Sequence, residues 1–121
     1  MKNLILFLLL AISSNCFSQD TITTAKVKEF MDKEVCVVGK VVSFKLAAEG
    51  KTTNYINIDK PYPESIFTVV ISNSYLEKLN LKIEDLKDKT IVVKGKITTY
   101  KNDPKQVPQI FNPISIVVKK E

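Results

Sequence analysis

Residues 88–101 read DKTIVVKGKITTYK, and residues 32–45 read DKEVCVVGKVVSFK, so the two segments align without a gap. Apolar or small residues alternate with polar ones along both, which is the pattern of a β-strand with one buried and one solvated face. The sequence therefore predicts two long strands of the same kind. The residues expected to point inward are Val37, Gly39, Val41 and Ser43 in one strand and Val93, Gly95, Ile97 and Thr99 in the other.

Each of these segments has a glycine at the same internal position, Gly39 in one and Gly95 in the other. A glycine inside a strand costs stability unless the backbone has to bend sharply or bulge there. Two long strands that bend at the same point favour a small closed barrel. Because the halves of the chain do not match outside these segments, we interpret the repeat as shared strand geometry, with an internal duplication as the alternative.

The other segments predict three more strands and two helices. Residues 23–33 have apolar side chains at helical spacing after a threonine that can cap a helix. Ser74 and Glu77 form a capping box for a second helix, which residues 80–82 are placed to interrupt. The strands are expected at residues 34–46, 52–59, 66–72, 89–101 and 109–120, the last interrupted by Pro113.

This order of elements predicts a mainly β fold. Five strands with a helix between the third and the fourth are typical of an OB-fold, a five-stranded Greek-key barrel. We expect such a barrel, preceded by the N-terminal helix. An open α+β sheet with the same order of elements is the alternative.

The second half of the chain resembles a known family. Residues 87–118, together with the segments VCVVGKVVSF and FTVVIS, are similar to OB-fold nucleic-acid-binding domains of the tRNA-anticodon-binding and helicase-type groups, which include small exported single-domain members. The resemblance covers residues 25–120, although the loop after Tyr100 is longer than in many members and has no glycine. The residues at the family's pattern positions are Gly95, Ile97, Tyr100, Pro108, Gln109, Ile110 and Pro113.

The resemblance implies a ligand site on the face of the second and third strands, between loops 46–52 and 101–108. Binding of a single strand of nucleic acid needs aromatic side chains for the bases and basic groups for the phosphates. Phe44 and Tyr100 are expected to point outward near these loops, and Tyr55 to point away from the core. The candidate ligand-binding residues are Phe44, Lys45, Lys51, Tyr55, Tyr100, Lys101 and Lys105.

These aromatic residues also have ordinary structural interpretations. An outward tyrosine often packs against a neighbouring strand, and Phe44 can pack beneath the first loop. Phe67 is expected in the core, whereas Phe111 fits either a buried or an exposed position.

Residues 1–19 have the pattern of a signal peptide, because Lys2 precedes an apolar run over residues 4–12 and small residues follow. The run is too short to span a bilayer. We expect a signal peptide at 1–19 and a single OB-fold-like domain at 20–121, exported to the periplasm or beyond, with no stable membrane span after processing. A lipoprotein acylated at Cys16 and a retained anchor are less favoured. Removal of the segment leaves Cys36, expected as a small buried side chain without a disulfide.

The composition argues against catalysis. The chain contains no histidine, which excludes Ser-His-Asp and Cys-His arrangements and histidine-containing metal sites. No carboxylate pair is spaced for acid–base chemistry, so we expect no enzyme activity, no cofactor and no metal. The net charge is +5, but all 18 basic residues are lysines, and arginine is the preferred partner of phosphates.

Two functions follow from this sequence. One is an exported OB-fold module that binds single-stranded nucleic acid or another polyanion. The other is an envelope domain that binds a protein or a small ligand and has no role with nucleic acid.

Overall fold

The structure is a computed structural model, and it describes residues 21–120. The predicted signal peptide and its cleavage site therefore lie outside the described residues, where the expectation remains untested. Among the described residues, no helix is long and apolar enough to cross a membrane.

The described part of the chain consists mainly of strands, joined by three short helical segments. The helical segments are η2 (Thr24–Phe30), α2 (Asn73–Leu79) and η3 (Ile83–Leu86). The strands are β1 (Thr21–Thr23), β2 (Glu34–Lys45), β3 (Thr53–Ile58), β4 (Thr68–Ser72), β5 (Thr90–Thr98), β6 (Gln109–Phe111) and β7 (Ser115–Val118).

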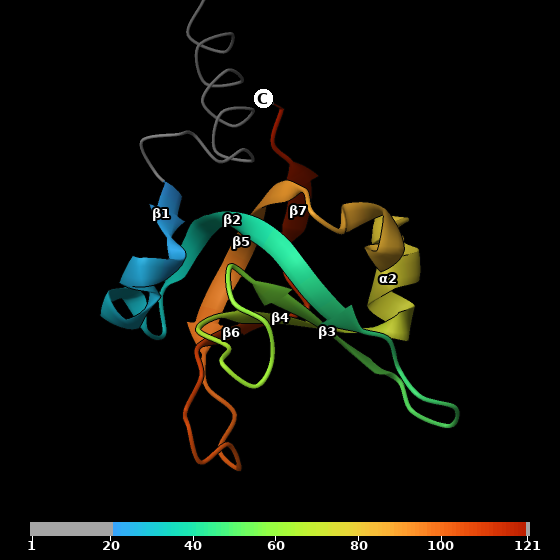
Figure 1. The fold of residues 1–121 in the computed structure, drawn as a ribbon, viewed down its shortest axis with the longest axis horizontal. Helices are drawn as coiled ribbons and strands as arrows, with labels where there is room; N and C mark the ends of the chain where they lie inside the picture. Colours follow the sequence, from blue (N-terminus) through green and yellow to red (C-terminus); the bar gives the residue numbers. More distant parts are fainter. Residues whose placement is uncertain (1–20, 121) are drawn as a thin grey trace, which may run out of the picture.

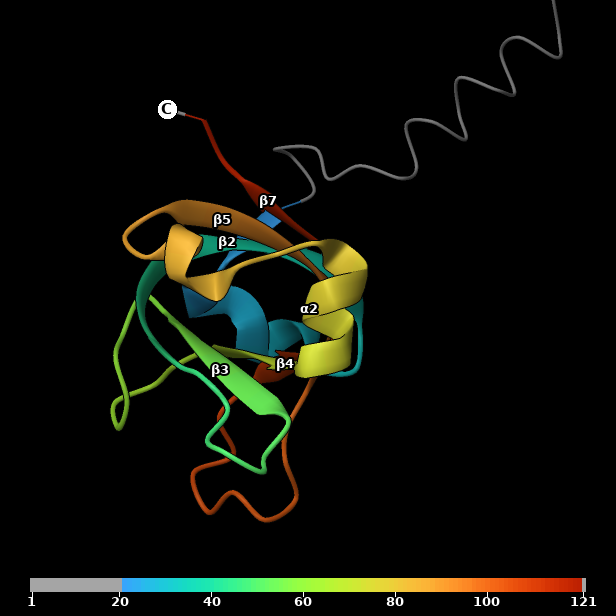
Figure 2. The same cartoon turned by 90° about the vertical axis from the view of Figure 1, so that its right-hand side faces the viewer.

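Five of these strands close into a ring, in the order β2–β3–β4–β6–β5 and back to β2. All neighbours in the ring are antiparallel except β4 and β6, which are parallel. In Figure 2, β2 and β5 form the upper wall of the barrel, and β3 and β4 form the lower wall. β1 and β7 extend the sheet outside the ring, so the expected barrel is present but the described chain has seven strands rather than five.

The last predicted strand is divided into β6 and β7 by Asn112 and Pro113. Asn112 has a left-handed backbone (φ 47°), and a proline has no N–H to donate to a strand ladder. β6 therefore pairs with β4 and the end of β5, whereas β7 pairs with the beginning of β5. A single predicted strand thus contributes one strand to the ring and one strand outside it.

The helices differ from the prediction in type and extent. The segment expected to be a helix over 23–33 is a 3-10 helix over 24–30, preceded by β1, and Thr23 makes no side-chain cap. The hydroxyl of Thr24 instead donates to Asp59 Oδ2 at 2.6 Å, which fastens η2 to the end of β3. Figure 1 shows η2 and α2 at opposite ends of the barrel.

α2 begins two residues before the expected position. Ser72, not Ser74, is the N-cap, and its Oγ accepts a hydrogen bond from the Tyr75 N–H at 3.3 Å. Asn80 takes a left-handed conformation and ends the helix, so η3 is a separate segment. The interruption predicted at 80–82 is confirmed, and the single helix is corrected to two short pieces.

The barrel interior is filled by aliphatic side chains and Phe67. At the two glycines of the repeated segment, an isoleucine of a neighbouring strand occupies the space that a Cβ would need: Ile58 at Gly39 and Ile110 at Gly95. The sequence predicted a bend of the backbone at these glycines, and the structure adds a close approach of the neighbouring strand at each of them. The buried core consists of Val27, Val37, Val41, Ile56, Ile58, Phe67, Val69, Ile71, Ile83, Leu86, Ile91, Val93, Ile97 and Ile110.

Cys36 is buried in β2, as expected. It is the only cysteine among residues 21–120, so the expectation of a mature domain without a disulfide stays a prediction. The only other cysteine of the sequence is Cys16, which lies outside the described residues.

Candidate functional site

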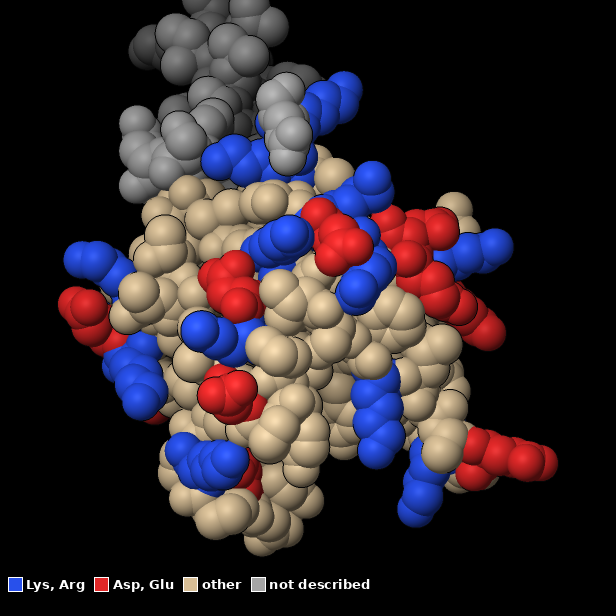
Figure 3. Space-filling model, viewed as in Figure 1, with Lys and Arg blue, Asp and Glu red and all other residues tan. Residues whose placement is uncertain are grey.

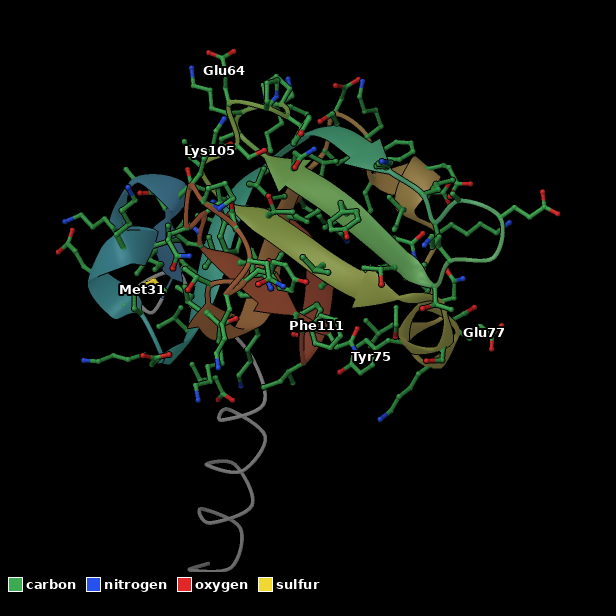
Figure 4. The ribbon with its side chains drawn as sticks, turned by 90° about the horizontal axis from the view of Figure 1, so that it is seen from below. Met31, Glu64, Tyr75, Glu77, Lys105 and Phe111 are labelled. Carbon is green, nitrogen blue, oxygen red and sulfur yellow. The ribbon has the colours of Figure 1, made fainter. Side chains whose placement is uncertain are left out.

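The outer face of β3, β4 and β6 carries a row of residues that are paired across four strands. Tyr55 and Phe111 are the large side chains of this row, exposed to 41% and 55% respectively, and buried Val70 lies between them. Alternation along each strand places all of them on the side opposite the core. Figure 4 looks onto this face, with Phe111 at its edge. The row is formed by Lys45, Tyr55, Val70 and Phe111, each paired with the next. We call it the aromatic row.

A second row on the same face is polar and carries no charge. It consists of Ser43, Asn57, Thr68 and Gln109, again paired in register. The Asn57 amide donates to Ser43 Oγ at 2.9 Å, and its oxygen accepts from Thr68 Oγ1 at 3.2 Å. These hydrogen bonds join the side chains of neighbouring strands beside the aromatic row.

The aromatic row continues toward α2. Asn112, next to Phe111, accepts a hydrogen bond from the Ser72 N–H at 2.9 Å, and Ser72 caps the helix that carries Tyr75. Figure 4 shows the rings of Phe111 and Tyr75 beside each other at this edge. The Lys78 ammonium lies 5.6 Å from the centre of the Tyr75 ring, within the range of a cation–π contact.

Two loops project from opposite ends of this face, as Figure 1 shows. The loop at 46–52 is held by Asn54, whose Oδ1 accepts from the Ala47 N–H at 2.8 Å and whose Nδ2 donates to Asn73 Oδ1 at 2.8 Å. Lys51 lies in this loop and is exposed. The predicted position of the face between two loops is thus observed, with the loops well separated.

The other loop, at 99–108, is organised by Asp103. Its carboxylate accepts hydrogen bonds from the backbone N–H groups of Val107 and Lys105, both at 2.9 Å. These bonds, from Val107 first and Lys105 second, lower the pKa of Asp103 below its ordinary value, and the positive charge of Lys105 acts in the same direction. The carboxylate therefore stabilises this turn in its ionised form.

The prediction that the Phe44 side chain points outward is wrong. In β2 the register shifts between Val41 and Ser43, so Val42 is the extra residue of a β-bulge. A one-residue shift exchanges the two faces of a strand. Phe44 therefore pairs with Ile56 and packs against the core, whereas Ser43, expected to point inward, lies on the outer face.

The structure brings together only part of the predicted site. Lys45 and Tyr55 are paired on the face, and Tyr55 points away from the core as expected. Tyr100 is 56% exposed, and its hydroxyl accepts from Asn102 Nδ2 at 3.2 Å in the loop at 99–108. Lys101 and Lys105 belong to the same loop, whereas Lys51 lies at the opposite end of the face.

Six residues of the face were not among the candidate ligand-binding residues from the sequence: Val70, Phe111, Ser43, Asn57, Thr68 and Gln109. Val70 has the parity opposite to Val69 and Ile71, and Asn57 has the same parity as Tyr55. Alternation along each strand was therefore a sufficient signal for two of them. For Phe111 the signal was weaker, because β6 is only three residues long.

Charge is distributed evenly over the side of the molecule in Figure 3, where lysines and carboxylates alternate. Between described residues, the only ion pair joins Lys87 and Asp88, at 3.6 Å. Within residues 21–120, no group of three or more histidine, cysteine, aspartate or glutamate side chains is arranged to hold a metal ion.

No protein-family model and no curated protein sequence matches the chain. Solved structures are similar in fold. An OBody bound to hen egg-white lysozyme superposes with a TM-score of 0.61 at 17% identity, covering 84% of this chain and 95% of that chain. A structure of yeast Stn1 and Ten1 gives a TM-score of 0.59 at 17% identity, covering 84% of this chain and 63% of that one.

A chain described as an aspartyl-tRNA synthetase from Leishmania major Friedlin gives a TM-score of 0.56 at 10% identity. The match covers 89% of this chain, which spans only 22% of the synthetase. At such low identities these similarities show the fold alone. Together with the closed ring of strands, they identify the chain as an OB-like domain.

Proposed function

We propose that the chain is an exported OB-fold binding module, without enzymatic activity, that binds single-stranded nucleic acid across the outer face of β3, β4 and β6. The observation that carries the proposal is the aromatic row, in which Tyr55 and Phe111 present exposed rings on a regular sheet. An exposed aromatic ring offers a stacking surface to any base.

The spacing of these rings suits an extended strand. Tyr55 and Phe111 are two strands apart, which corresponds to about 9–10 Å between their backbones. Two rings at this separation can stack separate bases of one strand. The polar row alongside offers amide and hydroxyl groups that can contact base edges.

The lysines lie where a bound strand would enter and leave the face. Lys45 continues the aromatic row, Lys51 lies in the loop beyond it, and Lys101 and Lys105 lie in the loop at the other end. Exposed ammonium groups attract phosphates and release counterions when they bind them.

A second candidate function uses the same face to bind an envelope protein. It is favoured because Lys45 is the only charged residue in the two rows, and because lysines and carboxylates are interspersed on the side of the molecule shown in Figure 3. Exposed aromatic side chains on a neutral face are characteristic of the centres of protein interfaces. Domains of similar fold occur in complexes with lysozyme, as in the OBody structure.

Fluorescence anisotropy with a labelled single-stranded oligothymidine at low and moderate salt tests the proposal. The dissociation constant is expected to be below about 100 μM at low salt, and it should increase as the salt concentration rises. Tyr55→Ala and Phe111→Ala should each weaken binding about fivefold or more, since base stacking typically contributes about 1–3 kcal/mol per base. Tyr62→Ala is the matched control, because Tyr62 is 80% exposed but lies in the loop at 59–67.

The two candidates give different outcomes. If the dissociation constant at low salt exceeds about 100 μM, or if it does not depend on the salt concentration, the nucleic-acid proposal is wrong. Affinity capture of a protein that is lost with Phe111→Ala but kept when Lys101 and Lys105 are changed to Glu would then favour the protein-binding candidate.

Export is proposed from residues 1–19 and has its own test. The intact mass of the protein from an exporting host should correspond to a chain that begins at Gln19 or Asp20. A mature chain that retains Cys16 would contradict the proposed cleavage, and recovery of the protein only from the cytoplasm would contradict export.

A further inference from the structure

A hollow of about 300 Å³ lies beside the barrel, away from the two rows of the outer face. It is an open hollow lined by three segments that are distant in the sequence: η2, the end of the loop at 59–67, and the end of the loop at 99–108. Its lining residues are Thr24, Ala25, Val27, Lys28, Ser65, Ile66, Lys105, Gln106, Val107 and Pro108. None of them belongs to the aromatic row or the polar row.

The walls of this hollow are fixed by hydrogen bonds between the segments. Lys105 Nζ donates to the Pro63 carbonyl at 3.0 Å, which joins the two loops. Asp103 holds the backbone of Lys105 and Val107, and Thr24 is bound to Asp59. The hollow is therefore built by specific contacts and not by the chance approach of free loops.

The lining combines an apolar floor with two cations. Val27, Ile66, Val107 and Pro108 supply apolar surface, and Lys28 has no hydrogen bond or ion pair with a described residue. The Lys105 ammonium has three N–H groups, and the Pro63 carbonyl accepts a hydrogen bond from one of them. Both lysines therefore retain N–H groups that can donate to an anion in the hollow.

No carboxylate lines the hollow, and the two that touch its lining residues are already bound. Asp59 accepts from Thr24 Oγ1 and from the Lys40 N–H, one bond to each oxygen. Asp103 accepts from the backbone of Lys105 and of Val107 in the same manner. Figure 4 shows Glu64, in the neighbouring loop, directed away from the fold.

We propose that this hollow, which we call the η2 pocket, binds a small carboxylate with a compact apolar body, at a position separate from the aromatic row and the polar row, with Lys105 as the one residue that both proposals use. The carboxylate lies between Lys28 and Lys105, and the apolar body lies against Val107 and Ile66. A volume of about 300 Å³ is at the lower end of the range for small-molecule sites, which suits a single fused aromatic ring system or a short aliphatic acid.

The probe for the test is 2-naphthoate, with 2-naphthamide as its neutral counterpart of similar shape. Titration of the ¹⁵N-labelled chain, followed by amide chemical shifts, should move signals of the lining residues of the η2 pocket. The acid is expected to bind at least fivefold more tightly than the amide, because only the acid interacts with the lysines.

Two variants separate the contributions of charge and space. Lys28→Gln with Lys105→Gln should weaken naphthoate binding at least fivefold and leave the amide unchanged. Ala25→Leu adds a larger side chain at an exposed position of η2 and should weaken both ligands. Lys51→Gln and Tyr55→Ala, on the loop and face outside the pocket, are matched controls and should change neither.

Equal affinity for the acid and the amide would overturn the proposal, as would shifts confined to the outer face or no shifts at all. Unchanged naphthoate binding in the double lysine variant would also overturn it. The amide spectrum of each variant reports its folding directly. Failure of this test leaves the oligothymidine experiment unaffected, because that experiment depends on Tyr55 and Phe111.

Discussion

Ile110 of β6 packs directly onto Gly95 of β5, so closely that a Cβ on residue 95 would lie less than 3.0 Å from Ile110 Cγ2. The backbone of Pro113 lies 3.5 Å from the same position. Gly95 thus lies beneath the corner at which the last strand turns from β6 to β7. Gly39 has the equivalent relationship with Ile58 at the end of β3.

Gly95→Ala and Gly39→Ala are each expected to lower the free energy of unfolding by about 1–3 kcal/mol, since the added methyl must displace a buried isoleucine. Urea unfolding followed by circular dichroism measures this change. Gly50→Asn is the control, because Gly50 has a positive φ (81°) that asparagine tolerates and no neighbouring atom within 4 Å. If both alanine variants are as stable as the parent chain, the close packing at the glycines is not as described.

Truncation of Phe44 is expected to lower the stability of the fold much more than truncation of Tyr55. Phe44→Ala removes a ring that packs against the core and should cost about 2–4 kcal/mol of stability. Tyr55→Ala removes an exposed ring and should cost less than about 1 kcal/mol, while weakening the proposed binding. Chemical denaturation and anisotropy of both variants test this. A large loss of stability in Tyr55→Ala alone would show that the bulge has been misplaced.

Asn54 is a buried polar side chain that joins three segments. It accepts from the Ala47 N–H and donates to the Ile71 carbonyl and to Asn73 Oδ1. Asn54→Ala leaves these partners unpaired and should lower stability by at least about 2 kcal/mol. Thermal unfolding measures the loss, with Asn102→Ala in an exposed loop as the near-neutral control.

Protonation of Asp103 should loosen the loop at 99–108. Because the folded-state pKa of Asp103 is depressed, its ionised form stabilises the loop above the ordinary pKa of about 3.9, and this contribution is lost as the pH falls through the lower folded-state value. The Val107 and Lys105 amide protons should then exchange faster below about pH 4, after correction for the intrinsic rate.

Asp103→Ala should produce the same faster exchange at neutral pH, whereas Glu64→Gln in the neighbouring loop should not. Amide hydrogen exchange by NMR distinguishes these outcomes. Equal protection of Val107 in Asp103→Ala and in the parent chain would contradict the assigned role of this carboxylate.

The order of strands, the two bending glycines and the core position of Phe67 could be predicted from the sequence, because alternation and glycine placement are local signals. The division of the last strand could be predicted in part from Pro113. The face of β2 on which Phe44 lies could not be predicted, because the bulge depends on how β2 pairs with β3. The sequence of β2 alone continues to alternate past the bulge. The role of Phe111 depends in the same way on pairing with β4.

The position of a candidate-site residue on the outer face could be predicted only where the sequence of its own strand was enough to assign it. Tyr55 was predicted because its parity is unambiguous. Lys45 was predicted from its place at the end of its strand, and only the bulge puts it on the outer face. The separation of Lys51 from Lys101 and Lys105 follows from the three-dimensional course of the loops. The η2 pocket combines three segments and had no sequence pattern.

Val42 is an extra residue in β2. The side chains that follow it therefore lie on the face opposite to the one that alternation from the beginning of the strand would give. A strand without the bulge, in which Val42 paired in regular register with Asn57, would instead place Phe44 in water and turn Lys45 toward the barrel interior. A related chain that lacks the extra residue aligns with this strand only when a gap is placed at residue 42, and a ligand-facing lysine is correctly matched only when that gap is respected.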